Sequence, residues 1–280
     1  MSAKRVAFIT GGMGGLGAAI SRCLHDAGTA VAMSHSERND HVATWLSHER
    51  DAGRHFVAYE ADVSSFDSCA HCAERVLAEF GTVDILVNNA AITRDSTFVR
   101  MNKEDWDNVL RTNLDSMFNM TRPLLGGMLK QQFGRIVNVG SVNGARGAFG
   151  QTNYAAAKAG IHGFTMSLAP EVARHGVTVN TVSPGYLATA MTAAVPKDVM
   201  ETKILPQIPV GRLGQPRQRS VIMKIAIIGL DLAKNLLQVH AVDLQGHIVV
   251  RNQLRRADVL RYLATLEPCV IGMQACGSSH

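Results

Sequence analysis

The sequence predicts an α/β fold, a doubly wound parallel sheet of six strands covered by helices. Short apolar runs alternate with helical segments from about residue 4 to residue 216. The first run leads into a glycine-rich turn and then into a helix, the order that places a ligand at the carboxyl edge of such a sheet. No stretch approaches the ~18 continuous apolar residues of a membrane span, and no signal peptide precedes the first strand. We therefore expect a cytoplasmic protein without a membrane partner.

The elements follow in order from these patterns. The first strand is predicted at Lys4–Thr10 as a buried apolar run, and the helix Ala18–Ala27 ends at Gly28, a common helix stop. Later strands are short β-branched or apolar runs, expected at Thr29–Met33, His55–Glu60, Val83–Val87, Arg135–Val139 and Val177–Val182. Later helices lie between them, expected at Asp40–Ala52, Ser65–Glu79, Lys103–Lys130 and around Tyr154–His175.

The turn between the first strand and the first helix suits a dinucleotide phosphate. Gly11 permits a tight turn, Gly15 lets the backbone approach a pyrophosphate, and Gly17 lets helix and strand pack closely. The N–H groups at the start of the helix then face the anion. Strand, glycine turn and helix in this order at the N-terminus are much stronger evidence than a glycine pattern alone.

The end of the second strand bears on the choice of dinucleotide. Ser34 and Ser36 leave room for a 2′-phosphate, and Arg38 can pair with it, so the segment favours NADPH over NADH. Glu37 and Arg38 could equally open the next helix.

Three polar residues follow or interrupt later elements. Asp62, which precedes Val63 at the end of the third strand, could accept a hydrogen bond from an adenine amine or cap the next helix. Asn88 at a strand end could brace the cofactor-side loops. Asn113 lies in the long predicted helix, where asparagine is unfavourable, so a polar task such as holding a water is expected.

A serine, a tyrosine and a lysine follow the fifth predicted strand. Tyr154 and Lys158 are four residues apart in an Ala-rich helix and therefore share one face. A neighbouring cation lowers the pKa of a phenol from its ordinary value of about 10, which suits a general acid. Ser141 can donate a hydrogen bond to the carbonyl oxygen that Tyr154 protonates. Taken alone, the short motif favours a half-buried tyrosine beside a solvated lysine, so motifs elsewhere decide the matter.

The composition permits a large hydrophobic core and excludes few classes of ligand or partner. The chain has 280 residues, of which 46% are apolar, and a net charge of +5 without a long Lys/Arg run. This charge does not indicate nucleic acid, and ligands bearing phosphates suit it equally well. Cys69-Ala-His-Cys72 lies in an amphipathic helical run without a second pair at zinc spacing, so we expect helix packing and no metal site.

With TGGMGGLG at Thr10–Gly17, NNAA at Asn88–Ala91, Asn113, Ser141 and Tyr154-x-x-x-Lys158, the chain resembles the short-chain dehydrogenase/reductases from about Lys4 to Pro216. The resemblance implies a Rossmann domain and a catalytic tetrad. Tyr154 would be the acid, Ser141 the carbonyl-binding donor, Lys158 the ribose anchor that also depresses the pKa of the tyrosine, and Asn113 the holder of a relay water. It implies cofactor contacts from Gly11, Gly12, Met13, Gly15, Leu16, Gly17, Arg38, Asp62, Val63, Asn89, Ala90, Tyr154, Lys158, Pro184, Gly185 and Thr189, the last at the nicotinamide carboxamide.

Within this family, Ile92–Asp95, Ser141–Gly160 and Val177–Thr189 look like segments of bacterial acetoacetyl-CoA reductases. That resemblance implies NADPH-dependent reduction of acetoacetyl-CoA to (R)-3-hydroxybutyryl-CoA, a precursor of polyhydroxybutyrate. Reductases of 3-ketoacyl carrier proteins are near relatives. The residues that would contact the acyl substrate are Asp95, Phe149, Gln151 and Tyr186, although Tyr186 could instead only pack its loop.

The chain departs from the family after residue 217, so two parts are expected, 1–217 and 218–280. The seventh family strand is missing, and strands are predicted at Lys224–Leu230 and Leu237–Val242. This tail resembles the start of insertion-sequence transposases with an RNase-H-like domain. Asp231 matches their first metal ligand, but Gln274 replaces their glutamate, and an amide is a weaker ligand for a divalent metal.

Three consequences are expected from this tail. DNA cleavage is not expected, and Arg251, Arg255, Arg256 and Arg261 are interpreted as a solvated helix face rather than a nucleic-acid site. The two strands could pair as a hairpin with a following helix, or stay loosely ordered. Loss of the seventh strand bares a sheet edge and puts the homotetramer of the family in doubt. An inactive remnant that binds dinucleotide is therefore the alternative to an enzyme.

Overall fold

The computed structural model describes residues 4–208 and 210–216, and the strands 227–232, 236–242, 248–255 and 270–274 of the C-terminal part. The chain divides into two compact units. One comprises Met1–Val179 and Ser183–Gln218, and the other Asn180–Val182 and Arg219–His280. No helix in the described part of the chain is long and apolar enough to cross a bilayer.

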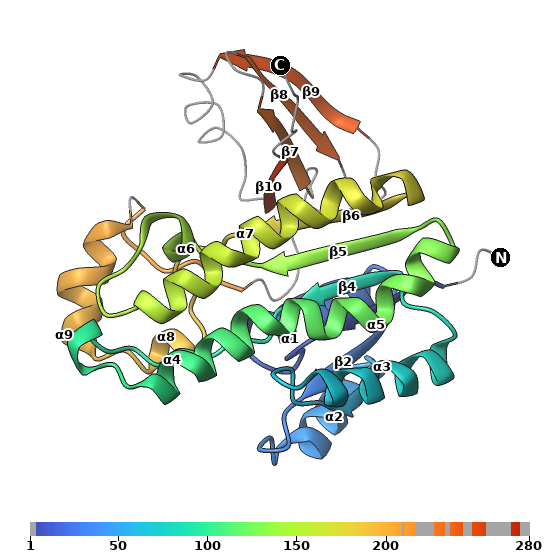
Figure 1. Cartoon of the computed structure of the whole chain (residues 1–280), viewed down its shortest axis with the longest axis horizontal. Helices are drawn as coiled ribbons and strands as arrows, with labels where there is room; N and C mark the ends of the chain where they lie inside the picture. Colours follow the sequence, from blue (N-terminus) through green and yellow to red (C-terminus); the bar gives the residue numbers. More distant parts are fainter. Residues whose placement is uncertain are drawn as a thin grey trace. The chain divides into compact units, whose positions relative to one another are not determined.

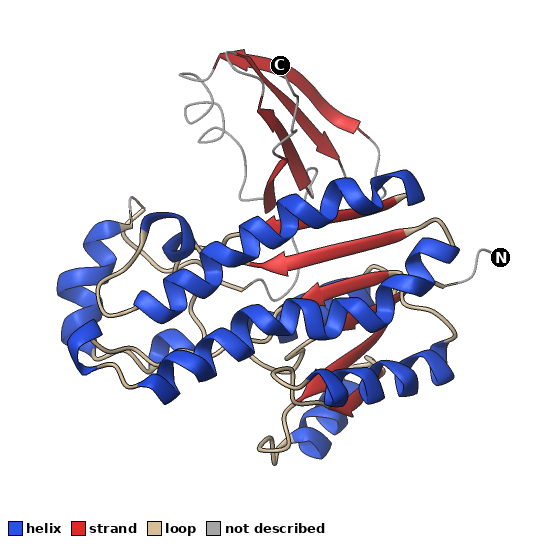
Figure 2. Ribbon diagram, viewed as in Figure 1, coloured by secondary structure: helices blue, strands red, loops and turns tan. Residues whose placement is uncertain are grey.

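A six-stranded sheet organises the first part of the chain, in the order β3-β2-β1-β4-β5-β6 (Figures 1 and 2). Its strands are β1 (Val6–Ile9), β2 (Ala30–His35), β3 (Phe56–Glu60), β4 (Ile85–Asn88), β5 (Gly134–Val139) and β6 (Val177–Val182). The pairs β3–β2, β2–β1, β1–β4 and β4–β5 are parallel. The predicted doubly wound α/β fold is confirmed. The strand order reverses between β1 and β4, the place where such sheets bind ligands.

Helices cover both faces of this sheet. They are α1 (Gly15–Asp26), α2 (Val42–Asp51), α3 (Phe66–Phe80), α4 (Lys103–Leu110), α5 (Ser116–Lys130), α6 (Val142–Arg146), α7 (Thr152–Val172), α8 (Ala190–Ala193) and α9 (Lys197–Val199). Figure 1 shows α3, α5 and α7 across one face. The five-residue helix α6 and the short helices after β6 were not predicted, because such short segments carry little helical periodicity.

The strands of the first sheet contribute side chains to two hydrophobic cores, one on each face of the sheet. Phe8 on β1 packs in one core with residues of α3 and α5 such as Val76 and Leu124, while Ile9 packs in the other with Leu16 and other residues of α1. Successive side chains of a strand point to opposite faces, so one strand serves both cores. This explains why the strands read as continuous apolar runs rather than as an alternating pattern.

Cys69 and Cys72 belong to the first of these cores. Both side chains are buried in α3, as the helix-packing interpretation predicts. Burial raises the pKa of Cys69 to about 12 and that of Cys72 to about 11, so both remain thiols at neutral pH. In the described residues no group of three or more His, Cys, Asp or Glu side chains is arranged to hold a metal ion.

The long helix predicted at Lys103–Lys130 is interrupted. A five-residue π-helical turn, η2 (Arg111–Asp115), separates α4 from α5. Asn113 lies in this turn with its side chain fully buried. Single π-turns inside helices frequently mark functional sites.

The C-terminal part forms its own four-stranded sheet, in the order β10-β7-β8-β9. The strands are β7 (Ile227–Leu232), β8 (Leu236–Val242), β9 (Ile248–Arg255) and β10 (Val270–Gln274). β7 and β8 pair antiparallel, as the hairpin alternative predicts, and β10 pairs parallel to β7 with Gln274 opposite Asp231.

The prediction that the tail arginines lie on a helix face is wrong for two of the four. Arg251 and Arg255 lie on the strand β9, which pairs antiparallel with β8. The regular ladder with β8 fixes an extended backbone there. The other two arginines, Arg256 and Arg261, and the helix expected after the hairpin lie outside the described residues.

Candidate active site

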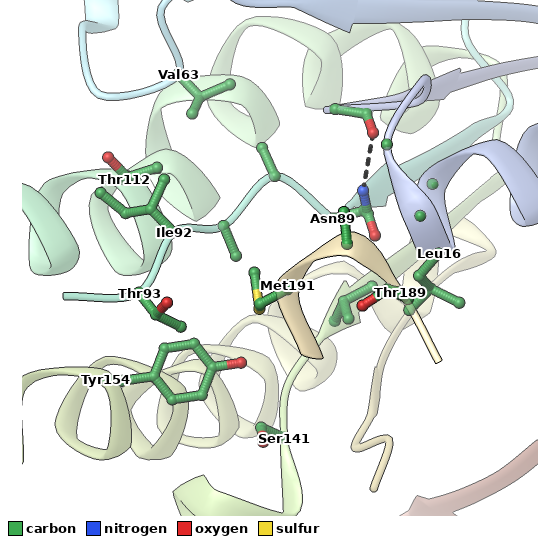
Figure 3. A pocket seen from close by; sticks show the side chains of 18 of the residues that line it. Leu16, Val63, Asn89, Ile92, Thr93, Thr112, Ser141, Tyr154, Thr189 and Met191 are labelled. Atoms are coloured by element: carbon green, nitrogen blue, oxygen red, sulfur yellow. Dashed lines mark hydrogen bonds between the residues drawn. The ribbon is translucent and has the colours of Figure 1, made fainter. Parts of the chain in front are cut away.

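A cavity of about 850 Å³ lies at the carboxyl ends of the strands of the first sheet (Figure 3). Segments that follow all six strands line it, represented in chain order by Gly11, Ser36, Asp62, Asn89, Ser141 and Pro184. Of the residues predicted to bind cofactor or substrate, or to act in catalysis, the cavity lining includes all except Gly12, Asn113 and Phe149. The sheet therefore gathers residues that are far apart in the sequence.

The glycine turn lies at one end of this cavity with the geometry that an anion requires. Gly11 has a φ of +62°, which L side chains rarely adopt. A Cβ on Gly17 would lie 2.2 Å from the Gly11 carbonyl oxygen, and one on Gly12 would lie 2.5 Å from the Met33 Cβ. No side chain caps α1, whose first residues line the cavity. The N–H groups of its first turn thus fit the phosphates of a dinucleotide.

Asn89 holds the glycine turn in place. Its side-chain Nδ2 donates to the carbonyl oxygens of Thr10 at 2.9 Å and Gly11 at 3.2 Å. The Thr10 hydroxyl oxygen accepts from the backbone N–H groups of Asn89 and Ala90. Figure 3 marks a hydrogen bond of the Asn89 side chain with a dashed line. The segment after β4 is therefore fixed directly to the segment after β1.

Two structural alternatives left open for the segments after β2 and β3 are resolved. Glu37 and Arg38 line the cavity from a turn and do not open a helix, because α2 begins only at Val42. Asp62 does not cap α3, since Ser65 is the N-cap and accepts from the Ser68 N–H. The carboxylate of Asp62 instead accepts from the N–H and hydroxyl of Ser64, at 2.9 and 2.7 Å.

Ser141, Tyr154 and Lys158 come together in the middle of the cavity lining. Ser141 is the N-cap of α6, and Tyr154 and Lys158 lie one turn apart on α7. The Lys158 Nζ is 5.7 Å from the centre of the Tyr154 ring. Lys158 is only 1% exposed and donates to the Val139 carbonyl oxygen at 2.7 Å, so the interpretation as a solvated lysine is wrong. In Figure 3 the Tyr154 hydroxyl points into the cavity, with Ser141 beside it.

The expected depression of the Tyr154 pKa is not observed. Burial raises the pKa of Tyr154 above its ordinary value, the Ser141 hydroxyl lowers it, and the charges of Asp95 and Tyr186 raise it further. Burial also lowers the pKa of Lys158 to about 8. Desolvation disfavours both charged forms and outweighs the attraction that the i, i+4 spacing suggested. The phenol therefore remains protonated at neutral pH and can donate its proton.

These two pKa shifts predict how reduction depends on pH. A tyrosine acid and a lysine cation must both be protonated, and the lower of the two pKa values, about 8 for Lys158, sets the limit. We expect kcat/KM for ketone reduction to fall as pH rises through about 8, because kcat/KM reports the free enzyme. Rate measurements between about pH 6 and 9.5 check this. Lys158→Met should be slow at every pH and lack this limb; an unchanged limb would assign it to another group.

Asn113 contacts the backbone rather than lining the cavity. Its Oδ1 accepts from the Ile92 N–H at 2.8 Å, and its Nδ2 donates to the Ile92 carbonyl oxygen at 2.9 Å. The two bonds fix the loop after β4 to the π-turn. The side chain thus has a polar task, as expected, but the partner is a peptide group; the predicted relay water remains a proposal.

Three of the four residues predicted to contact the acyl substrate line the cavity. Asp95, Gln151 and Tyr186 line the cavity, whereas Phe149 is 93% exposed and outside the lining. The Gly150 backbone accepts from the Ser96 N–H, which joins the loops at 96 and 150. Phe149 therefore lies outside this cavity, and its contact with an acyl substrate stays a prediction. The Cβ direction at a loop position cannot be predicted from the sequence.

Asn143 and Arg146 of α6 were missed by the sequence analysis. Asn143 is 5% exposed, lines the cavity and contacts Gln151, and Arg146 contacts Asn143 and Tyr186. The sequence signal that could have pointed to Asn143 is a polar residue two positions after Ser141. In the same helix, a Cβ on Gly144 would lie 2.7 Å from the Lys158 carbonyl carbon, so the backbones of α6 and α7 are in direct contact.

A sequence profile of the family described as short chain dehydrogenase matches residues 5–200. The chain belongs to the short-chain dehydrogenase family. It is 50% identical to acetoacetyl-CoA reductase of Cupriavidus necator over 215 residues, 77% of this chain and 87% of that protein. It is 45% identical to 3-oxoacyl-[acyl-carrier-protein] reductase of Vibrio cholerae over 214 residues, 76% of this chain and 86% of that protein. A crystal structure of an actinorhodin polyketide ketoreductase variant with NADPH matches with a TM-score of 0.72 at 34% identity, covering 77% of this chain and 87% of the other.

Membership of this family identifies the chain as an oxidoreductase that uses a nicotinamide dinucleotide. The glycine turn, the uncapped start of α1 and the cavity at the strand ends fit such a cofactor. The short-chain dehydrogenase region ends well before the C-terminal sheet, which the profile does not cover.

Proposed function

We propose that the protein reduces the keto group of acetoacetyl-CoA to (R)-3-hydroxybutyryl-CoA with NADPH. The observation that carries the proposal is the joint placement of Ser141, Tyr154 and Lys158 in one cavity with the glycine turn. The similarity to acetoacetyl-CoA reductases, at 44–50% identity in several bacteria, supports this substrate.

The chain's own residues supply a hydrogen bond, a proton and a positive charge. When bound, the nicotinamide supplies the hydride that reduces the ketone carbon. Ser141 donates a hydrogen bond to the ketone oxygen, and Tyr154 transfers its hydroxyl proton to that oxygen as negative charge develops. The raised pKa of Tyr154 keeps the proton on the phenol until then. The Lys158 ammonium, 5.7 Å from the ring centre, stabilises the phenolate left behind.

Several residues would hold the dinucleotide. The glycine turn from Gly11 to Gly17 would bind its phosphates through backbone N–H groups. Asp62 and Val63 would contact the adenine, and Lys158 the ribose. Pro184, Gly185 and Thr189 would border the nicotinamide, and each of them lines the cavity.

Arg38 favours NADPH over NADH. It lines the cavity beside Ser34 and Ser36, at the end where the 2′-phosphate would lie. Replacing Arg38 with alanine should lower the preference for NADPH by about 10- to 100-fold, the loss of one charge-assisted contact. The ratio of kcat/KM for the two dinucleotides measures this. Arg50→Ala removes the same charge from the exposed face of α2 and should leave the ratio unchanged; an equal effect of both variants would contradict a specific contact.

The test of the proposed function is an assay of the full chain. Purified protein, acetoacetyl-CoA and NADPH should give a falling NADPH absorbance and an (R)-3-hydroxy product on chiral chromatography. A flat trace from folded protein, with thermal stabilisation by NADPH, would favour the alternative of a dinucleotide-binding remnant. Among the described residues, the sheet built on β1 to β6 has six strands, one fewer than the family expectation, and this is the observation behind that alternative.

A carrier-protein thioester is the second substrate candidate. The 45% identity to 3-oxoacyl-[acyl-carrier-protein] reductase of Vibrio cholerae favours it. Comparing kcat/KM for acetoacetyl-CoA with that for the acetoacetyl carrier protein distinguishes the two. A ratio well above one assigns coenzyme A as the preferred carrier.

A further inference from the structure

Four side chains form a continuous hydrogen-bonded chain, and three of them, Asp95, Asn143 and Gln151, line the cavity. Arg146 Nε donates to Asn143 Oδ1 at 3.2 Å, and Asn143 Nδ2 donates to Gln151 Oε1 at 2.9 Å. Gln151 Nε2 then donates to Asp95 Oδ2 at 2.7 Å. Every bond runs in the same direction, from the guanidinium toward the carboxylate.

The charged ends fix the orientation of the two amides between them. A guanidinium can only donate and a carboxylate can only accept, so Asn143 must turn its oxygen to Arg146 and Gln151 must turn its nitrogen to Asp95. Bonds to charged partners are stronger than bonds between neutral groups, and aligned bonds polarise one another. Asn143 is 5% exposed, so water has little access to replace a lost partner.

The hydrogen bonds from Arg146 to Asp95 join the segments that surround the reacting groups. Asp95 follows β4, Asn143 and Arg146 belong to α6, and Gln151 directly precedes α7, which carries Tyr154. Arg146 also contacts the segment after β6, because its Nη2 donates to the Tyr186 hydroxyl oxygen at 3.4 Å. Three independent loops and one helix are therefore held in one arrangement.

Asn143 also contacts the serine directly. Its backbone N–H donates to the Ser141 hydroxyl oxygen at 3.1 Å. An acceptor site of that oxygen is then engaged, and the hydroxyl proton is left to donate into the cavity. The position of Asn143 thus affects both the donor Ser141 and, through Gln151, the start of the helix that carries Tyr154.

We propose that Asn143 is a positioning residue, which aligns Ser141 with Tyr154 through the chain from Arg146 to Asp95. This inference rests on the proposed function, because the aligned groups are the two that contact the ketone oxygen. Asn143 touches neither cofactor nor reacting atoms in this role. Its side chain sets the distance between two groups that must meet one atom.

Asn143→Asp tests whether the direction of these hydrogen bonds matters. The aspartate still accepts from Arg146 but cannot donate to Gln151, so the Gln151 oxygen loses its donor. We expect kcat for acetoacetyl-CoA to fall by about 10- to 100-fold, the effect of a small misplacement of reacting groups, with the Kd for NADPH unchanged. Asn102→Asp is the matched control, because Asn102 is an exposed N-cap of α4 and aspartate caps equally well.

The double variant Asn143→Asp with Asp95→Asn reverses the direction of the two hydrogen bonds made by Gln151 instead of breaking them. Gln151 can flip, donate to the new carboxylate at 143 and accept from the new amide at 95. We expect kcat of the double variant to exceed that of Asn143→Asp at least threefold, although Asp95→Asn alone lowers kcat. The melting temperatures of the four proteins should show the same non-additivity.

The possible outcomes separate this inference from the proposed function. An active parent protein whose two substitutions have independent effects on kcat overturns the positioning role and leaves the function standing. A parent protein without turnover refutes the proposed function and the positioning role together. In that case, additive melting temperatures would show in addition that the hydrogen-bonded chain does not couple the two residues.

Discussion

Replacing Tyr154 with phenylalanine is expected to lower the rate of acetoacetyl-CoA reduction by about 10²- to 10⁴-fold, the usual contribution of a general acid. The substitution removes only the hydroxyl that faces the cavity and leaves the ring beside Lys158. Because burial already disfavours the charged form of Tyr154, loss of the hydroxyl should leave the fold intact. Initial rates with saturating NADPH measure the effect, and fluorescence titration measures NADPH binding, which should change less than threefold.

Tyr59→Phe is the control for this substitution. Tyr59, on β3, is more deeply buried than Tyr154, and its hydroxyl donates to Glu79 at 2.6 Å outside the cavity lining. The control should lose stability but retain the parent rate. A Tyr154→Phe protein that reduces the ketone at near the parent rate would show that another group, or water, delivers the proton.

Replacing Gly17 with alanine is expected to weaken NADPH binding by about 10²- to 10³-fold, since two or more charge-assisted backbone hydrogen bonds would be misplaced. The added Cβ would meet the Gly11 carbonyl oxygen at 2.2 Å and the Asn89 Nδ2 at 2.7 Å. The turn and the side chain that braces it must therefore move apart. Isothermal titration measures the affinity, and the melting temperature reports the cost to the fold, about 1–3 kcal/mol for an overpacked site.

Gly126→Ala is the matched control for the turn. Gly126 lies inside α5, and a Cβ there would meet nothing within 4 Å. Alanine favours the helix by about 0.5–1 kcal/mol, so the control should bind NADPH normally and melt slightly higher. Equal affinities of the two variants for NADPH would contradict the role of the glycine turn.

Local patterns were sufficient to predict the sheet and the helix that carries Tyr154 and Lys158. The six strands of the first sheet lie within two residues of their predicted ends, because each is a short apolar run bounded by turn residues. Tyr154 and Lys158 share a face of α7 because helical spacing alone requires it. Gly11 adopts a positive φ, as a tight turn at that position demands.

Properties set by contacts between distant segments could not be predicted. The pKa of Tyr154 depends on burial contributed by the whole cavity, and the sequence shows only its neighbour Lys158. Asn113 pairs with the backbone of Ile92, 21 residues earlier, which no spacing rule indicates. The contact of Gln151 with Asp95 joins loops 56 residues apart. Such pairings follow from the assembly of the whole sheet with its loops and not from any single element.

The direct backbone contact between α6 and α7 at Gly144 has a further consequence. With no side chain at position 144, α6, which Ser141 caps, and α7, which carries Tyr154, pack backbone against backbone at this point. Any larger residue at position 144 would act as a wedge and tilt one helix away from the other. The spacing of Ser141 and Tyr154 therefore also depends on position 144, where only glycine leaves room for this backbone contact.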